Sequence, residues 1–224
     1  MYEETEMSEK KIIITIGRQT GSGGREIGSA VAQRLGIRYF DSELLERAAR
    51  ESGLAESLFE THDEKPTNSF LYSLVMDGFG FGGKTLPGEV PLDQTVFLAQ
   101  FNTIKKIAEE GSCVMVGRCA DFALEDDPDL FSVFLHADLD FRAARIASEK
   151  GITDAKAREF ILKTDKKRGS YYNYYTNNSW GAAITYDLCL NSSKFGIDEC
   201  VDIICNAVTG KSRLNDDSSR TEEL

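Results

Sequence analysis

The chain has 224 residues, 41% hydrophobic and 28% charged, with a formal net charge of −11 at pH 7. It is long and apolar enough for one sizeable α/β domain with an insertion or a lid. The acidic balance argues against nonspecific nucleic-acid binding through a broad basic surface. No apolar run approaches the roughly 20 residues that span a membrane, and the acidic first ten residues lack a signal-peptide core. We therefore expect a cytoplasmic protein with no membrane or nucleic-acid partner, and its oligomeric state stays open.

Apolar strands alternate with amphipathic helices along the chain. Strands are expected at 11–17, 37–41, 113–117, 130–138 and 186–193. Helices are expected at 24–35, 42–52, 139–151 and 197–208. This alternation predicts an α/β fold with a five-stranded parallel sheet flanked by helices, and ligands at the carboxyl ends of the strands.

Several stretches fall outside this rhythm. Residues 1–10 and 211–224 are polar and are expected to be disordered tails, which leaves 11–210 as the folded domain. Within it, about 54–110 is predicted to be a largely helical insertion with a mobile Gly-rich loop. The segment of about 152–180, rich in charge and tyrosine, is predicted to be a lid.

The five cysteines are odd in number and form no C-x-x-C pair; they stand at 113, 119, 189, 200 and 205. The chain has only two histidines, His62 and His136. Both observations favour buried reduced thiols over a metal or redox site.

The string GRQTGSGGREIG, from Gly17 to Gly28, lies between a predicted strand and a predicted helix. Glycines let the backbone approach phosphate oxygens, and the start of the helix offers N–H groups and a positive dipole end. The pattern predicts a phosphate-binding loop; a tight turn without a ligand is the alternative. We assign ATP-phosphate binding to Arg18, Gly21, Ser22, Gly23, Gly24, Arg25 and Glu26.

The ordinary pattern G-x-x-x-x-G-K-[ST] is not met in this loop. Gly24 stands where the lysine would be, and Arg25 and Glu26 follow where a hydroxyl residue would hold magnesium. An arginine fork suits phosphate oxygens. Arg25, in the first turn of the helix, is a better candidate than Arg18 for the missing charge. Pairing of Arg25 with an acidic surface residue is the alternative.

A basic segment runs from Arg142 to Arg168, with nine basic and four acidic residues and hence a local balance of +5. A phosphoryl-transfer transition state spreads negative charge over three equatorial oxygens. A basic lid closing over ATP would stabilise that charge and exclude water. Arg142, Arg145 and Arg168 are therefore candidate catalytic residues together with Arg25. A solvated helix face is the alternative.

A resemblance to a known family is carried by five segments: IITIGRQTGSGGREIG, YFDSELLERAA, VGRCADF, VFLHADLDFRAARI and TDKKRGSYYNYYT followed by YDLCLNSS. They resemble the cytidylate kinases, and most closely the divergent cytidylate kinase-like branch of the nucleoside monophosphate kinases. The resemblance spans roughly residues 11–208. It implies a P-loop kinase fold with an acceptor-binding insertion and a lid, and transfer of the γ-phosphoryl group of ATP to CMP or dCMP with Mg²⁺, whose protein ligands stay unknown.

The same resemblance implies an acceptor site. Cytidylate kinases end the second strand in Asp-Ser, with an arginine five positions after the serine; Asp41, Ser42 and Arg47 match that spacing. Their third strand leads into Gly-Arg-Asp, and here Cys119 replaces the aspartate. The acceptor-binding residues implied are Asp41, Ser42, Arg47, Arg118 and Asp121.

Simpler roles stay open for several of these residues. Asp41 or Ser42 would also serve as a helix N-cap, and Arg47 would also pair with Glu43 one turn earlier. Two other functions stay open as well. One is a P-loop kinase for another small acceptor, which Cys119 and the insertion favour. The other is a nucleotide-binding protein without turnover, which the altered loop favours.

Overall fold

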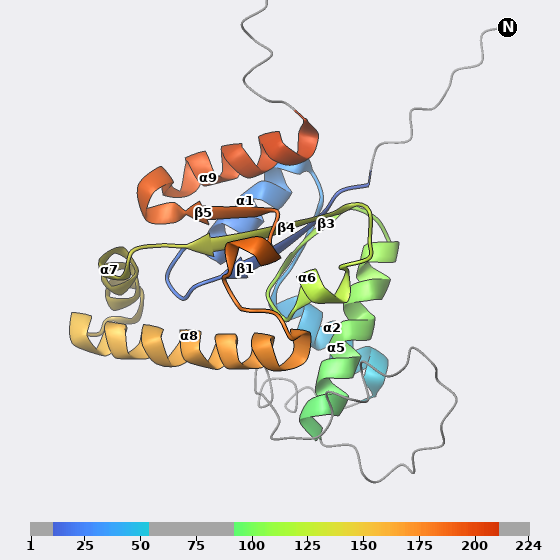
Figure 1. Ribbon diagram of the computed structural model, residues 1–224, viewed down its shortest axis with the longest axis horizontal. Helices are drawn as coiled ribbons and strands as arrows, with labels where there is room; N and C mark the ends of the chain where they lie inside the picture. Colours follow the sequence, from blue (N-terminus) through green and yellow to red (C-terminus); the bar gives the residue numbers. More distant parts are fainter. Residues whose placement is uncertain (1–10, 54–91, 211–224) are drawn as a thin grey trace, which may run out of the picture.

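One parallel five-stranded sheet organises the computed structural model, which describes residues 11–53 and 92–210. The strand order is β2-β3-β1-β4-β5 (Figure 1). The strands are β1 (Ile13–Arg18), β2 (Arg38–Phe40), β3 (Cys113–Val116), β4 (Leu130–His136) and β5 (Leu188–Asn191). The central strand β1 pairs in parallel with β3 and with β4. The segments that follow these three strands therefore leave the sheet at one edge.

Helices cover both faces of this sheet. They are α1 (Gly24–Leu35), α2 (Ser42–Ser52), α5 (Leu92–Glu109), α6 (Ala120–Ala123), α7 (Leu139–Lys150), α8 (Asp154–Thr176) and α9 (Ser192–Thr209), with a 3-10 turn at Ala183–Thr185. In Figure 1, α1 and α9 lie on one side of the sheet and α8 runs along the other. Within 11–53 and 92–210, no helix combines the length and the apolar character that crossing a membrane requires.

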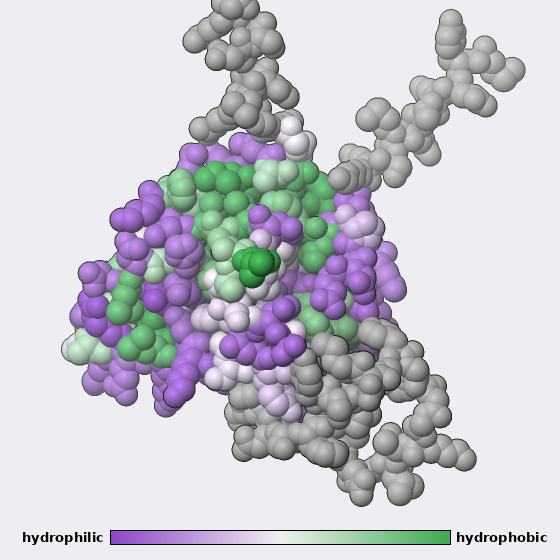
Figure 2. All heavy atoms as spheres, viewed as in Figure 1, coloured by the Kyte–Doolittle hydropathy of each residue, from purple (hydrophilic) through white to green (hydrophobic). Residues whose placement is uncertain are grey.

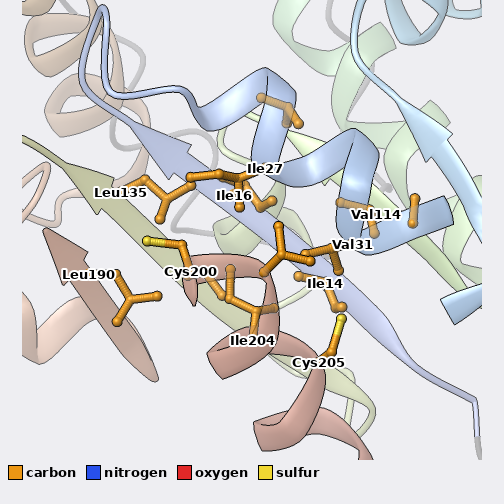
Figure 3. Packing of buried hydrophobic residues seen from close by; sticks show 14 residues of the cluster. Ile14, Ile16, Ile27, Val31, Val114, Leu135, Leu190, Cys200, Ile204 and Cys205 are labelled. Carbon is orange, nitrogen blue, oxygen red and sulfur yellow. The ribbon is translucent and has the colours of Figure 1, made fainter. Parts of the chain in front are cut away.

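Alternation along β1 divides its side chains between two cores. Ile14 and Ile16 are fully buried and belong to the core on the side of α1 and α9. Val31 of α1 and Ile204 of α9 pack there with them (Figure 3). Because Ile27 and Val31 stand four residues apart, α1 presents a single apolar stripe to the sheet. This packing fixes the start of α1 directly behind the glycine-rich segment.

Ile13 belongs to the core on the opposite face. It clusters there with Met115 of β3, Leu44 of α2 and Ile107 of α5. Nearly the whole length of β1 is thus buried on both sides, as its continuous apolar run predicts.

An aromatic cluster holds α8 over the sheet. Phe134 of β4 and Tyr171 and Tyr175 of α8 are buried in it. Tyr175 stacks on Phe97 of α5 with ring centroids 3.9 Å apart. Aromatic side chains bury a large area and favour such defined geometries, so the tyrosines of the predicted lid fix its position.

The predicted five-stranded parallel sheet is confirmed, with strand ends that differ by a residue or two. The final helix begins at Ser192 rather than at 197, because an extra turn precedes a kink at Gly196, where φ is 79° and ψ is 173°. The predicted lid at about 152–180 contains one long helix, α8. Of the predicted insertion, 92–109 forms α5, while 54–91 lies outside the described residues, as do the predicted tails 1–10 and 211–224.

All five cysteines are free thiols, four of them buried and Cys189 half-buried. The predicted burial is confirmed for these four. Burial raises the pKa of Cys113 to about 11, and that of Cys200 likewise to about 11. Both thiols therefore stay protonated at neutral pH.

Ile204→Ala should lower the free energy of unfolding by about 2–5 kcal/mol, because it deletes a fully buried side chain and leaves a cavity between α9 and β1. Ile184→Ala is the matched control: Ile184 is 98% exposed, and we expect a change within about 0.5 kcal/mol. Denaturant unfolding measures both. Equal losses in the two variants would contradict this account of the core.

Candidate active site

The glycine-rich segment 17–24, here called the glycine loop, connects β1 to α1. Gly21 and Gly23 have φ of 81° and 80°, a left-handed conformation that glycine adopts at little cost. Gly23 caps α1 without a side-chain hydrogen bond. The first turn of α1 therefore presents its backbone N–H groups and the positive end of its dipole to the loop. This is the geometry that binds phosphate groups at helix N-termini.

The back of the glycine loop is tied to β4 and α9. The N–H of Gln19 donates to the carbonyl of Leu135 at 2.9 Å, and its Oε1 accepts from the N–H of Ala137 at 3.2 Å. The fully buried Ser22 hydroxyl donates to the carbonyl of Gln19 at 2.9 Å. Ser192 Oγ donates to the carbonyl of Ser22 at 2.7 Å. The hydroxyl of Ser22 is thus engaged within the loop, and the backbone is what the loop offers to a ligand.

Arg18 fills the space beside the loop. It ends β1 and is only 6% exposed. A Cβ atom at Gly24 would lie 2.6 Å from the Cβ of Arg18, and a Cβ at Gly117 would collide with its guanidinium. In the ordinary pattern the first glycine stands five residues before the second. Gly23 corresponds to the second glycine, so Arg18 stands where the first would be. The two departures are therefore linked: the stem of Arg18 occupies the room that a lysine at position 24 would need.

Asp41 forms ion pairs with Arg25, at the start of α1, and with Arg118, just after β3. Its Oδ2 lies 2.7 Å from Arg25 Nε, and its Oδ1 lies 3.1 Å from Arg118 Nη1. Asp41 and Arg118 are buried, whereas the Arg25 side chain is 67% exposed. The structure thus brings three of the predicted site residues together. To reach a phosphate in the loop, Arg25 would exchange Asp41 for that ligand. Ser42 begins α2, and its side chain lies outside the described part of the structure.

Three consecutive residues after β3 have a left-handed backbone. Their φ angles are 79° at Gly117, 55° at Arg118 and 54° at Cys119. For a residue with a side chain this conformation costs about 1–2 kcal/mol. Strain of this kind concentrates at functional sites, where the surrounding structure holds it. Here the turn directs the Arg118 guanidinium back over β3, where Nη1 also donates to the carbonyl of Val116 at 3.1 Å.

Asp121 is hydrogen-bonded to helix α8. The Tyr172 hydroxyl donates to Asp121 Oδ2 at 2.5 Å. Burial raises the pKa of the Asp121 carboxyl, and the hydrogen bond from Tyr172 opposes that shift. Burial also raises the pKa of Tyr172, so its hydroxyl stays protonated and remains a donor at neutral pH.

These elements border a small hollow that is partly open to solvent and has a cavity volume of about 20 Å³. We call it the arginine hollow, because Arg18, Arg118 and Arg168 reach it from the ends of β1 and β3 and from α8. Cys119, which stands where the resemblance implies an aspartate, forms part of its wall. The full lining consists of Gly17, Arg18, Gly117, Arg118, Cys119, Asp121, Arg168, Tyr171, Tyr172, Trp180 and Tyr186.

Two of the predicted lid arginines contact the glycine loop and helix α1. Arg168 Nη1 donates to Thr20 Oγ1 at 3.1 Å and lies 3.4 Å from the carbonyl of Arg18. Arg145 Nη2 pairs with Glu26 Oε2 at 2.5 Å. The glycine loop and the arginine hollow therefore share Arg168.

The third lid arginine, Arg142, is buried against the loop backbone. Its Nη1 donates to the carbonyl of Thr20 at 3.2 Å and lies 2.6 Å from Asp165 Oδ2. Its Nε donates to the carbonyl of Ala137 at 3.0 Å. Two nitrogens of the Arg142 side chain, Nη1 and Nε, thus have hydrogen-bond partners within the protein.

Arg47, like Asp41, is a predicted acceptor residue that does not line the arginine hollow. Its Nε lies 2.7 Å from Glu51 Oε1, and its guanidinium also binds Glu110. Arg47 and Arg38 together lower the pKa of Glu110 to about 2. Arg47 therefore pairs with Glu51, one turn later in α2. The side chain of Glu43, its partner in the alternative interpretation, lies outside the described residues.

The remaining charges of the basic segment include pairs on a solvated face. Arg158 pairs with Asp154 and Asp140, each at 2.7 Å, and Lys150 Nζ lies 4.7 Å from the ring centroid of Phe160. Hydrophilic residues cover much of the face over α7 and α8, interspersed with apolar ones (Figure 2). The basic excess therefore divides between a loop-facing side and a solvated side.

Sequence reasoning missed Asp165 and Trp180. Asp165 was hidden because it is one acidic residue in a basic run. A signal for it was present, since Asp165, Arg168 and Tyr172 stand at i, i+3 and i+7 and so share one face of a helix. Trp180 follows α8 in a turn, and no helical spacing connects it to the site.

The described ranges contain no cluster of three or more His, Cys, Asp or Glu side chains that could hold a metal ion. Mg²⁺ at phosphoryl-transfer sites is bound through one or two carboxylates together with substrate phosphates and water. The glycine loop is the part of the described chain whose geometry fits phosphate groups.

The sheet order, the loop and the covering helix define the P-loop kinase class. Among solved structures, shikimate kinase from Bacteroides thetaiotaomicron shares the fold, with a TM-score of 0.52 and 16% identity over 88% of this chain and 98% of that one. An uncharacterized protein from Eubacterium ventriosum superposes with a TM-score of 0.66 at 29% identity, over 89% of this chain and 99% of that one.

Within that class the family follows from the sequence comparison. The model of the cytidylate kinase-like family matches residues 13–194, and the chain belongs to this family. Curated relatives include the cytidylate kinase of Pyrococcus horikoshii, 26% identical over 97% of this chain and 98% of the relative. The cytidylate kinase of Archaeoglobus fulgidus is 27% identical over 88% of this chain and 95% of the relative. The predicted family and fold are confirmed.

Gly24→Lys, which restores the lysine of the ordinary loop, should destabilise the protein by about 1–3 kcal/mol because the new side chain meets the stem of Arg18. In an Arg18→Gly background the same lysine should cost little. Thermal or denaturant unfolding of the two singles and the double measures this coupling. Equal costs in both backgrounds would show that Arg18 does not exclude the lysine.

Tyr172→Phe should lower the free energy of unfolding by about 1–3 kcal/mol, because the Asp121 carboxylate loses its donor. The bond stabilises the ionised carboxyl, so the loss should be largest above the raised pKa of Asp121 and shrink as pH falls through it. Tyr174→Phe is the control, since the buried Tyr174 hydroxyl has no hydrogen-bond partner among the described residues. A loss that does not vary with pH would argue against this role of Tyr172.

Proposed function

We propose that the protein transfers the γ-phosphoryl group of MgATP to a nucleoside monophosphate, with CMP and dCMP as the acceptors. Membership of the cytidylate kinase-like family supports phosphotransfer. The names of the curated relatives suggest the acceptor. The P-loop kinase fold supplies the expected relation between a phosphate-binding loop and a neighbouring acceptor site.

The observation that carries this proposal is the arginine hollow beside the glycine loop. Arg18, Arg118 and Arg168 line it from three separate elements, in a chain whose net charge is −11. Concentrating guanidinium groups in one partly enclosed site favours a phosphorylated ligand. Four aromatic rings, from Tyr171, Tyr172, Trp180 and Tyr186, border the same space and offer flat surfaces for a base or a sugar.

The proposed mechanism is one of positioning and charge. The backbone N–H groups of residues 21–26 bind the β- and γ-phosphates of ATP, and the acceptor phosphate binds in the arginine hollow. Phosphoryl transfer needs little covalent chemistry from the protein. Arg168, which contacts both the loop and the hollow, is placed to meet charge that develops between them. Helix α8 covers the loop and excludes water.

The remaining predicted residues have supporting roles in this proposal. Arg25 supplies charge to the ATP phosphates after leaving Asp41, and Arg145 holds Glu26 at the first turn of α1. Asp41 orients Arg118, and Asp121 orients Tyr172 in the wall of the hollow. Arg47 and Ser42 contribute to the acceptor side from α2.

Two specific features favour other functions. Cys119 occupies the wall of the hollow where cytidylate kinases carry an aspartate, which favours a kinase for another small acceptor. The loop lacks its lysine, and Ser22 is committed to Gln19, which favours nucleotide binding without turnover.

A coupled ADP-release assay over CMP, dCMP, UMP, AMP, GMP and small hydroxyl acceptors separates these functions. We expect ADP release with CMP or dCMP above the rate with ATP alone. Release with a non-nucleotide acceptor would replace the proposed substrate. Nucleotide that raises the melting temperature while no acceptor is phosphorylated would identify a binding protein.

Arg118→Ala should lower kcat/KM for the acceptor by roughly ten- to a hundred-fold, since a charge-assisted contact contributes about 1.5–3 kcal/mol. ATP affinity should change little, because the Arg118 guanidinium lies on the acceptor side. Arg50→Ala is the control, as Arg50 is exposed on α2. Steady-state kinetics with each substrate varied, and melting temperatures to verify folding, provide the measurement. Full acceptor kcat/KM in a folded Arg118→Ala protein would refute the assignment.

A further inference from the structure

We propose that Asp165 of α8 is a positioning residue: together with Arg142 it clamps the glycine loop at Thr20 and so sets the loop's geometry for the ATP phosphates. This inference rests on the proposed function, because it assumes that the loop binds nucleotide. It concerns a residue that the sequence did not single out, and it gives Arg142 a role different from direct contact with the transferred group.

The clamp consists of four contacts around one peptide segment. The N–H of Thr20 donates to Asp165 Oδ1 at 2.8 Å. The carbonyl of Thr20 accepts from Arg142 Nη1 at 3.2 Å. Asp165 Oδ2 and Arg142 Nη1 close the ring at 2.6 Å. Arg142 Nε is anchored to the carbonyl of Ala137 at the end of β4, at 3.0 Å. Both polar groups of the Thr20 backbone are therefore held by a charged pair.

The ion pair of Arg142 and Asp165 is largely buried. The side chains of Arg142 and Asp165 are 8% and 14% exposed. A charged pair taken out of water is tolerated only where further hydrogen bonds satisfy both partners, and here the loop backbone supplies them. The backbone of Arg142 also lies against the loop, since a Cβ at Gly21 would come within 3.0 Å of its carbonyl oxygen. The loop is thus fixed at Thr20 and Gly21, directly before the glycines that approach phosphate.

The same face of α8 then reaches the arginine hollow. One turn after Asp165, Arg168 donates to Thr20 Oγ1, and one turn further Tyr172 donates to Asp121. A single helix therefore sets the loop at Asp165 and the wall of the hollow at Tyr172. Because the Arg142 guanidinium is engaged with Asp165, Thr20 and Ala137, it acts through the loop's geometry rather than on the phosphoryl group.

The decisive variant replaces the pair by apolar residues of similar size, Arg142→Met with Asp165→Leu. Replacing a buried ion pair in this way is often neutral or stabilising for a fold, so the melting temperature should stay near that of the wild type. The loop, however, loses its clamp. We expect the Kd for MgATP, measured by isothermal titration calorimetry on the full chain, to rise at least about tenfold, as for other lost charge-assisted contacts.

A single variant should have an intermediate effect on the Kd for MgATP. Asp165→Asn keeps an acceptor for the N–H of Thr20 but removes the charge facing Arg142, so its Kd should lie between those of the wild type and the double variant. Arg158→Gln with Asp154→Asn is the matched control, because it removes an exposed ion pair from the same helix; we expect an unchanged Kd.

A double variant with wild-type stability and wild-type Kd for MgATP would overturn the clamp. So would an equal rise in Kd for the Arg158 and Asp154 control. A wild-type protein that binds MgATP but phosphorylates no acceptor would count against the proposed function alone, and the loss of affinity in the double variant would still support the clamp. Wild-type protein that binds no nucleotide would overturn both.

Discussion

Parallel pairing of β1 with β3 and β4 is the constraint on which the rest of the site depends. Because the three strands run in the same direction, the segments after Arg18, Val116 and His136 emerge side by side at one edge of the sheet. Burial of β1 on both faces, by Ile13 on one side and Ile14 and Ile16 on the other, fixes this edge. The glycine loop, the strained turn at 117–119 and the start of α7 are neighbours for that reason.

Charge is then concentrated at this edge against the acidic balance of the whole chain. Two buried arginines there have a carboxylate partner: Arg118 has Asp41, and Arg142 has Asp165. Desolvating a guanidinium is unfavourable unless such partners satisfy it. The partners also fix its direction, and fixed charges stabilise a transition state better than charges that must reorganise.

Helix α8, part of the predicted lid, is packed on the sheet through its tyrosines. Its tyrosines are buried with Phe97 and Phe134, and its polar face reaches the loop at Asp165 and Arg168. The charge excess of residues 142–168 overstated the number of arginines that face the loop, because Arg158 pairs with Asp154 and Asp140 on the solvated side. Composition gives only the number of charges, whereas the orientation of the helix about its own axis decides which of them face the loop.

The sequence by itself determined the parallel five-stranded sheet, the glycine loop before α1 and the family, because apolar periodicity and local glycine spacing are properties of short segments. It also named most residues that the structure brings together at the loop and the hollow, among them Arg18, Asp41, Arg118 and Arg168. Only the tertiary structure decided their partners. It joined Arg25 to Asp41, turned Arg47 toward Glu51 and Glu110, placed Arg18 where a lysine at 24 would need room, and revealed Asp165 at Thr20. The physical reason is that such contacts form between residues far apart in the sequence, as in the hydrogen bond from Thr20 to Asp165. Whether two such residues meet depends on how the intervening elements pack rather than on their spacing along the chain.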